Sequence, residues 1–172
     1  MTPSEILCRK FSFSEAELLS YVATCPYRYK RYRIKKRHGH GYREIAQPAR
    51  DLKAIQYVLL DEFFDRKLAS HECATAYKRG ASILENAAPH LGNNYLLKMD
   101  FKDFFPSIKD HDFDSYLYNK MNLRDESERR IVTRIFFMKI GEQRVLSIGS
   151  PGSPIISNAL LYDFDERVAV KL

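Results

Sequence analysis

The chain has 172 residues, of which 45% are hydrophobic and 29% are charged, a balance that excludes a disordered or fibrous protein and is typical of a globular one. Its formal net charge of +6 favours a polyanionic partner such as nucleic acid, although a merely basic surface gives the same number. Cys8, Cys25 and Cys73 lie far apart and form no CxxC pair, so they indicate neither a zinc knuckle nor a disulfide framework.

The two ends of the chain differ in what they indicate. The N-terminal residues 1–10 lack the charged-then-apolar pattern of a secretion signal, and no stretch approaches the roughly 20 apolar residues that span a bilayer. We therefore expect a cytoplasmic protein with no membrane partner, a setting in which thiols stay reduced. Residues 164–172 stop inside a pattern that still predicts helix, which indicates the N-terminal part of a longer protein.

The first half of the chain predicts a helix, a basic hairpin and a second helix. Ser14 and Glu17 have the spacing of a capping box, so a short helix follows them. Residues 29–48 alternate tyrosine and isoleucine with basic residues around turn glycines, which predicts a hairpin that Pro48 ends. Residues 49–68 predict an amphipathic helix, whose apolar face carries Leu52, Ile55, Leu59 and Phe63.

The second half mixes short strands and helices without strict alternation, so we expect an α+β fold rather than a doubly wound sheet. A strand at residues 95–99 ends on Asp100, and Ser153 followed by Pro154 predicts a capped helix start. The other predicted elements are a loop and short helix at 76–90 with Gly80 as its pivot, helices at 111–121 and 126–140, a strand at 143–148, a tight loop at 149–154, and a final apolar stripe of Ile156, Leu160, Phe164 and Val168.

Asp100 is the most informative single residue of the sequence. A carboxylate at the C-terminal end of a strand lies at the rim of a sheet, and Asp100 shares a strand face with Leu96 and Lys98. Mg²⁺ prefers oxygen ligands and usually takes only one or two carboxylates from a protein, so Asp100 is a candidate magnesium ligand. On these residues alone, an ordinary acid that caps the following turn is the more common explanation.

Four segments resemble, in chain order, the motifs of reverse transcriptases, and most closely those of bacterial retrons. The first catalytic motif, an aspartate that ends a palm strand with an aromatic residue after it, is matched by YLLKMDFKDFFPSI at residues 95–108. The next motif, a Gly-x-x-x-Ser-Pro turn before a helix, is matched by residues 147–168. Residues 32–56 resemble the fingers hairpin, and residues 76–90 carry an NAxxH typical of retron and group II intron enzymes.

The resemblance implies the fingers and a partial palm of a right-hand polymerase, with an antiparallel palm sheet packed on helices. The expected boundaries are an N-terminal helical segment at 1–28, fingers at 29–92 and the first part of the palm at 93–172. The implied activity is Mg²⁺-dependent copying of part of a cognate structured non-coding RNA into RNA-linked msDNA, which acts in anti-phage defence. The implied partners are that RNA, its RNA–DNA hybrid, dNTPs and an effector protein of nuclease or ATPase type.

The resemblance also assigns the nucleotide site. Asp100 would bind two Mg²⁺ ions, assisted by the backbone carbonyl of Phe101. The ring of Phe105 would exclude a ribose 2′-hydroxyl, whereas Phe104 would pack in the core. Two cations on opposite arms of the hairpin would bind the triphosphate, and a glycine would let the backbone approach it; these implied residues are Lys36, Arg43 and Gly149.

Template and primer contacts are implied for basic and small residues that would position the strand without identifying its bases. They are Arg33, Lys35, Arg37, Lys78, Arg79, Ser153, Pro154 and Asn158. Asn86 would brace the fingers loop and His90 would be half-buried. A solvated basic turn is the alternative interpretation of the hairpin charges, and His38 and His40 have no third ligand nearby that would make them a metal site.

Two departures from the family pattern qualify this interpretation. Ile148 stands where most members carry a glutamine that contacts the incoming sugar, which leaves nucleotide selectivity open. The family's YxDD hairpin and its thumb have no counterpart in the sequence, and the three acids Asp163, Asp165 and Glu166 are not expected to replace them. The alternatives are a group II intron-like or abortive-infection reverse transcriptase, or a non-catalytic scaffold that binds RNA or protein.

Overall fold

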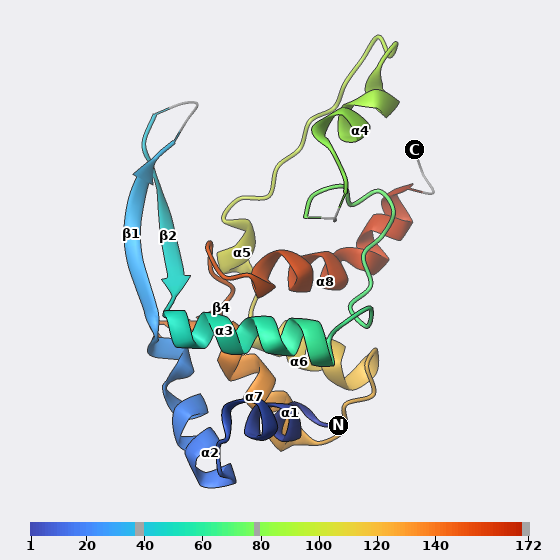
Figure 1. Ribbon diagram of the computed structural model, residues 1–172. Coiled ribbons are helices and arrows are strands. Elements are labelled where there is room, and N and C mark those ends of the chain that lie inside the picture. The colour runs from blue at the N-terminus through green and yellow to red at the C-terminus, as the bar shows by residue number, and fades with distance from the viewer. Residues whose placement is uncertain (37–39, 78–79, 170–172) are drawn as a thin grey trace.

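The computed structural model describes residues 1–36, 40–77 and 80–169, which form a mixed fold of helices and two small antiparallel sheets (Figure 1). The α-helices are α1 (Pro3–Phe11), α2 (Glu15–Thr24), α3 (Arg50–Val58), α4 (Ile83–Ala87), α5 (Phe104–Ser107), α6 (Asp110–Asn119), α7 (Glu126–Phe136) and α8 (Gly152–Ala169). Shorter helical turns are η1 (Cys25–Tyr27), η2 (Leu59–Phe63) and η3 (Ala88–His90). The strands are β1 (Tyr29–Lys35), β2 (Tyr42–Pro48), β3 (Met138–Ile140) and β4 (Gln143–Val145).

The first two helices begin at side chains that complete their first turns. The hydroxyl of Thr2 accepts a hydrogen bond from the Glu5 amide, while the Glu5 carboxylate accepts one from the Thr2 amide. Ser14 and Glu17 repeat this arrangement at the start of α2, as the sequence predicted. Both pairs satisfy backbone groups that a helix otherwise leaves without partners.

The core lies where α1, α3, α6 and α7 meet, and aromatic rings fill much of it. Phe113 of α6 stacks on Phe137, with ring centroids 6.0 Å apart, and Phe64 meets Phe136 edge-on at 5.9 Å. Such offset and edge-on pairs are the favoured geometries of aromatic side chains. The predicted apolar face of the helix at 49–68 is confirmed, since its four residues are all buried here: Leu52, Ile55, Leu59 and Phe63.

The hairpin β1–β2 projects from one side of this helical block, and the segment that contains α4 projects from the other side (Figure 1). Helices α5 and α8 lie between the two projections. The register pairs Tyr29 with Pro48 at the base of the hairpin and Lys35 with Tyr42 near its tip, which confirms the predicted hairpin. Three of the four motif segments therefore lie near one another (Figure 1): the hairpin, the segment at α5 and the start of α8.

The predicted strand at residues 95–99 is wrong for this chain. These residues form an irregular segment that pairs with no strand among the described residues. Their side chains are exposed, with Tyr95 at 93%, Leu97 at 83% and Met99 at 83%. A strand requires a hydrogen-bonded neighbour, so apolar character alone does not form one.

The boundary between α7 and β3 also differs from the prediction. The helix predicted at 126–140 ends at Phe136, because Met138–Ile140 pair with Gln143–Val145 as a small antiparallel sheet. This pairing also shortens the strand that was predicted at 143–148. Tertiary pairing has overridden a local helical pattern here.

Helix α8 starts two residues earlier than predicted, at Gly152 and not at Pro154, so Ser153 lies within the helix and is not its N-cap. Of the predicted apolar stripe, Ile156 is buried, whereas Phe164 is 49% and Val168 39% exposed. The far half of α8 is therefore more exposed than its start, although the Phe164 ring meets that of Phe101 with centroids 6.1 Å apart. No helix in the described ranges is long and apolar enough to cross a membrane.

The start of α8 is packed tightly against α7. A methyl group added at Gly152 would overlap the ring of Phe136, which is fully buried. Only a residue without a side chain fits this contact without a shift of the ring.

Gly152→Ala should lower the free energy of unfolding by about 1–3 kcal/mol, because overpacking forces Phe136 out of its position. Chemical denaturation of the chain measures this loss. In a Phe136→Ala background the additional loss should be smaller, since alanine removes the ring atoms that the methyl group meets. An equal loss in both backgrounds would contradict the steric explanation.

Candidate active site

A hollow of about 630 Å³ lies between the hairpin and the segment that leads into α5. It gathers residues from four parts of the chain that are distant in sequence. They are Lys36, Tyr42, Arg43, Tyr77, Asp100, Phe101, Lys102, Asp103, Phe104, Phe105 and Ile148. The structure thus brings together the predicted metal ligand, the predicted triphosphate cations and the predicted sugar-selecting ring.

The strand register explains why Lys36 and Arg43 lie together. Arg43 pairs with Ile34, and Lys36 is two residues further along the same strand direction, so all three share one face of the hairpin. The Lys36 amide donates to the Gly41 carbonyl at 3.1 Å, which extends the pairing to this residue. Both cations are exposed, and one polyphosphate can therefore reach both of them.

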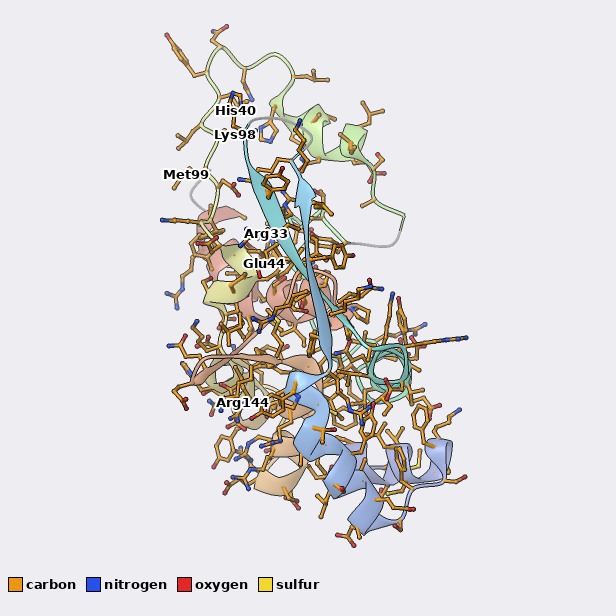
Figure 2. The ribbon with its side chains drawn as sticks, turned by 90° about the vertical axis from the view of Figure 1, so that its left-hand side faces the viewer. Arg33, His40, Glu44, Lys98, Met99 and Arg144 are labelled. Carbon is orange, nitrogen blue, oxygen red and sulfur yellow. The ribbon has the colours of Figure 1, made fainter. Side chains whose placement is uncertain are left out.

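The other face of the hairpin carries a different set of residues. Arg33 pairs with Glu44 and Lys35 with Tyr42, so their side chains alternate with those of Lys36 and Arg43. Figure 2 shows Arg33 and Glu44 at one level of the hairpin, with His40 nearer its tip. Arg33 and Lys35, two of the predicted template contacts, therefore lie on the opposite face of the hairpin from Lys36 and Arg43.

The acidic side of the hollow contains two carboxylates. Asp100 and Asp103 are both exposed and line it, although we expected only Asp100 there. Asp103 has a left-handed backbone, with φ of 49°, and it immediately precedes α5. Within the described ranges, neither carboxylate makes a hydrogen bond or ion pair through its side chain, so their oxygens are available to a ligand.

These carboxylates fit one Mg²⁺ ion better than two. Mg²⁺ commonly takes one or two carboxylates and completes its shell with water and substrate phosphates. Among the residues that the structure describes, no three His, Cys, Asp or Glu side chains are grouped so that they could hold a metal ion. A second ion would therefore need ligands from elsewhere.

The aromatic wall of the hollow is built from rings in contact. The centroids of Phe101 and Phe104 are 5.5 Å apart, those of Phe104 and Phe105 are 5.2 Å apart, and Tyr77 lies 6.4 Å from Phe105. Phe105 is half-buried and packs partly against the core, which holds its ring in place. The expectation that Phe104 is a core residue is wrong, because its ring lines the hollow instead.

Gly149 does not line the hollow, and its immediate neighbour is the hairpin. Its φ is +122°, and a Cβ atom there would lie 3.2 Å from the Ala46 carbonyl oxygen and 3.3 Å from Ile45 Cγ2. The amide of Ala46 donates to the carbonyl of Ile148 at 2.9 Å. A glycine is required because this loop crosses β2 closely, whereas its contact with nucleotide stays a prediction.

The predicted template residues of α8 lie outside the hollow. The Ser153 hydroxyl is buried without a hydrogen-bond partner in the described part of the chain, and Pro154 is half-buried. Asn158 donates to the Ala76 carbonyl at 3.1 Å, so it fixes the chain next to Tyr77. Three further predicted residues lie outside the residues that the structure describes: Arg37, Lys78 and Arg79.

Asn86 was expected to brace the fingers loop and His90 to be half-buried, and the structure agrees with only one of these expectations. Asn86 accepts a hydrogen bond from the Thr75 hydroxyl at 2.8 Å and so ties the two ends of the loop. His90 is exposed, so the expectation that it is half-buried is wrong.

Sequence reasoning missed four residues of the hollow, namely Tyr42, Tyr77, Lys102 and Asp103. Each lies beside a residue that was recognised, and Asp103 is three positions from Asp100. Proximity to a recognised motif was the available signal. No periodicity distinguishes these residues from other exposed loop residues.

Residues 34–172 match the family model described as reverse transcriptase (RNA-dependent DNA polymerase). The chain belongs to the reverse transcriptase family. It is 37% identical over 145 residues to the retron Ec83 reverse transcriptase of Escherichia coli, covering 82% of this chain and 46% of that protein. It is 35% identical over 159 residues to the retron Ec73 reverse transcriptase of the same organism, covering 89% and 49%.

A second bacterial species supplies a similar relative. The retron Mx65 reverse transcriptase of Myxococcus xanthus is 35% identical over 154 residues, covering 82% of this chain and 35% of that protein. This reverse transcriptase chain is thus a homologue of retron enzymes, and it spans about half the length of the Escherichia coli relatives that it matches.

In the full-length reverse transcriptase, Arg43→Ala should raise the KM for dNTP by about tenfold, because a charge-assisted hydrogen bond to phosphate is lost. Steady-state primer extension measures this constant. The matched control is Arg33→Ala on the opposite face of the hairpin, which should leave the KM for dNTP unchanged and weaken template binding in a salt-dependent manner. Equal increases in both variants would contradict the division of the two faces.

Proposed function

We propose that this chain forms the nucleotide-binding part of a retron reverse transcriptase. The complete enzyme copies part of a cognate structured non-coding RNA into DNA that stays linked to the RNA, and this product acts in anti-phage defence beside an effector protein. The observation that carries the proposal is the hollow in which Lys36, Arg43, Asp100 and Phe105 meet. Similarity to retron enzymes in two bacterial species supports the assignment to retrons.

The residues of the hollow have different roles in nucleotidyl transfer. Lys36 and Arg43 neutralise the triphosphate and orient it, while the ring of Phe105 stands beside the sugar. Asp100, with the Phe101 carbonyl and with Asp103 nearby, would hold Mg²⁺. That ion, when bound, activates the primer oxygen and stabilises charge on the phosphates.

The second magnesium ion requires carboxylates from outside this chain. We place them in a Tyr-x-Asp-Asp hairpin of the remaining half of the protein, as the family resemblance implies. The thumb that holds the nucleic acid would lie there as well. The activity proposed here is therefore that of the full-length protein.

The basic face of the hairpin would bind nucleic acid. Arg33 and Lys35 are exposed there, and such cations position a template or primer through its phosphates. We extend this role to Arg37, Lys78 and Arg79 on sequence grounds. The same proposal for Ser153 and Pro154 requires that bound nucleic acid approach the start of α8.

Two alternatives remain distinct from this proposal. A group II intron-like or abortive-infection reverse transcriptase shares all of the chemistry, and a neighbouring structured RNA gene distinguishes the retron from both. A non-catalytic scaffold would use the basic hairpin without the carboxylates. A YxDD sequence in the same reading frame favours the enzyme over the scaffold.

Asp100→Asn in the full-length protein should reduce DNA synthesis by about two orders of magnitude or more, because an amide replaces the charged metal ligand. Primer extension on an RNA template measures the rate. The control Asp163→Asn removes an exposed acid of α8 that pairs with Lys120 at 2.9 Å and lies outside the hollow, and it should leave the rate unchanged. Wild-type synthesis by the Asp100 variant would refute the proposed role.

Phe105→Ala should raise incorporation of ribonucleotides relative to deoxyribonucleotides by roughly tenfold or more, because the ring no longer excludes the 2′-hydroxyl. Competition between dNTP and rNTP in primer extension measures the ratio. Phe11→Ala removes another half-buried ring that packs against the core, in α1, and should not change the ratio. An unchanged ratio in the Phe105 variant assigns sugar selection to another residue.

A further inference from the structure

Gln56 is a polar residue on an otherwise apolar helix face. Its neighbours Leu52, Ile55 and Leu59 are buried in the core, and Gln56 itself is fully buried. An unpaired primary amide in such a place would destabilise the protein, so its hydrogen-bond partners show why the residue is there.

The partners of Gln56 come from three separate elements. Its Nε2 donates to the Ile135 carbonyl at 2.8 Å and to the Tyr29 hydroxyl at 3.3 Å, and its Oε1 accepts from the Ser150 hydroxyl at 3.0 Å. A backbone carbonyl only accepts, so the NH₂ group must face Ile135 and the oxygen must face Ser150. Ile135 lies in the last turn of α7, where carbonyls lack helical partners.

The Tyr29 contact reaches the base of the hairpin. Tyr29 is the first residue of β1 and pairs with Pro48, the last residue of β2. Burial raises the pKa of the Tyr29 hydroxyl, so the group keeps its proton and also donates to the Ile135 carbonyl at 3.5 Å. The two strands that pair here lead to Lys36 and Arg43 at the hollow.

The Ser150 contact reaches the loop on the other side of the hollow. Ser150 is buried and follows Gly149, while Ile148 of the same loop lines the hollow. The backbone bond from Ala46 to Ile148 holds the loop to β2, and the bond from Ser150 to Gln56 holds it to α3.

We propose that Gln56 is a positioning residue that fixes the loop at Ile148 relative to the hairpin cations, and thereby sets how tightly the polymerase binds an incoming dNTP. The Gln56 amide joins both walls of the hollow, and the loss of any arm leaves the Ala46–Ile148 bond to hold the loop to the hairpin with less support. The inference rests on the proposed function, since it concerns the same nucleotide site.

The test compares Ser150→Ala and Gln56→Met in the full-length protein. Each should raise the KM for dNTP by about fivefold and change kcat by less than about twofold, because the variants affect binding geometry and not the reacting groups. The double variant should be no worse than Gln56→Met alone, because the two side chains act through one hydrogen bond. Primer extension gives both constants, and thermal unfolding gives the stability of each variant.

The matched control is Ser157→Ala in α8. Ser157 is fully buried, but its hydroxyl donates only to the Pro154 carbonyl of its own helical turn at 2.9 Å. This variant should leave the KM for dNTP unchanged even if it lowers the melting temperature. If Gln56→Met does not fold, Tyr29→Phe takes its place in the test, because this variant removes the hydroxyl to which Gln56 Nε2 donates.

Two results would overturn the inference. Ser150→Ala with an unchanged KM for dNTP shows that the network only stabilises the fold, and additive effects in the double variant show that the residues do not act together. Asp100→Asn in the same assay separates this failure from that of the proposed function. If Asp100→Asn loses synthesis while Ser150→Ala keeps its KM for dNTP, the inference about Gln56 is rejected and the proposed function stands.

Discussion

The site depends on a close approach between two stretches of backbone. The loop before α8 crosses β2 so tightly that a Cβ atom at Gly149 would lie 3.2 Å from the Ala46 carbonyl oxygen. A hydrogen bond between Ala46 and Ile148 fixes the crossing. Ile148 lines the hollow, so this contact lies where cations and carboxylates from opposite halves of the chain meet.

The sequence correctly predicted the structural features that depend on interactions between nearby residues. The capping box at Ser14, the basic hairpin and the apolar face of α3 were all correct, because each depends on residues a few positions apart. The strand before Asp100 was wrong because a strand requires a paired neighbour, and residues 95–99 pair with no strand in the described part of the chain. Asp103 and the buried role of Gln56 escaped prediction for the same reason, since only tertiary contacts place one in the hollow and satisfy the amide of the other.

The two faces of the hairpin carry different cations, and we propose a different ligand for each face. Strand alternation places Lys36 and Arg43 on one face and Arg33 and Lys35 on the other. In the proposed enzyme a nucleotide and a nucleic-acid strand therefore meet cations of the same short element without competing for them. A slip of one residue in the register would exchange the two sets, which makes the pairing at the base of the hairpin as important as the charges at its tip.

The exposed apolar segment before α5 has a consequence for biosynthesis. Leu91, Tyr95, Leu97 and Met99 are all more than two-thirds exposed, at 75%, 93%, 83% and 83%. Such a stretch, once it leaves the ribosome, is a template on which a neighbouring nascent chain can pair. Association with another chain through this stretch therefore competes with folding, since residues 95–99 pair with no strand among the described residues.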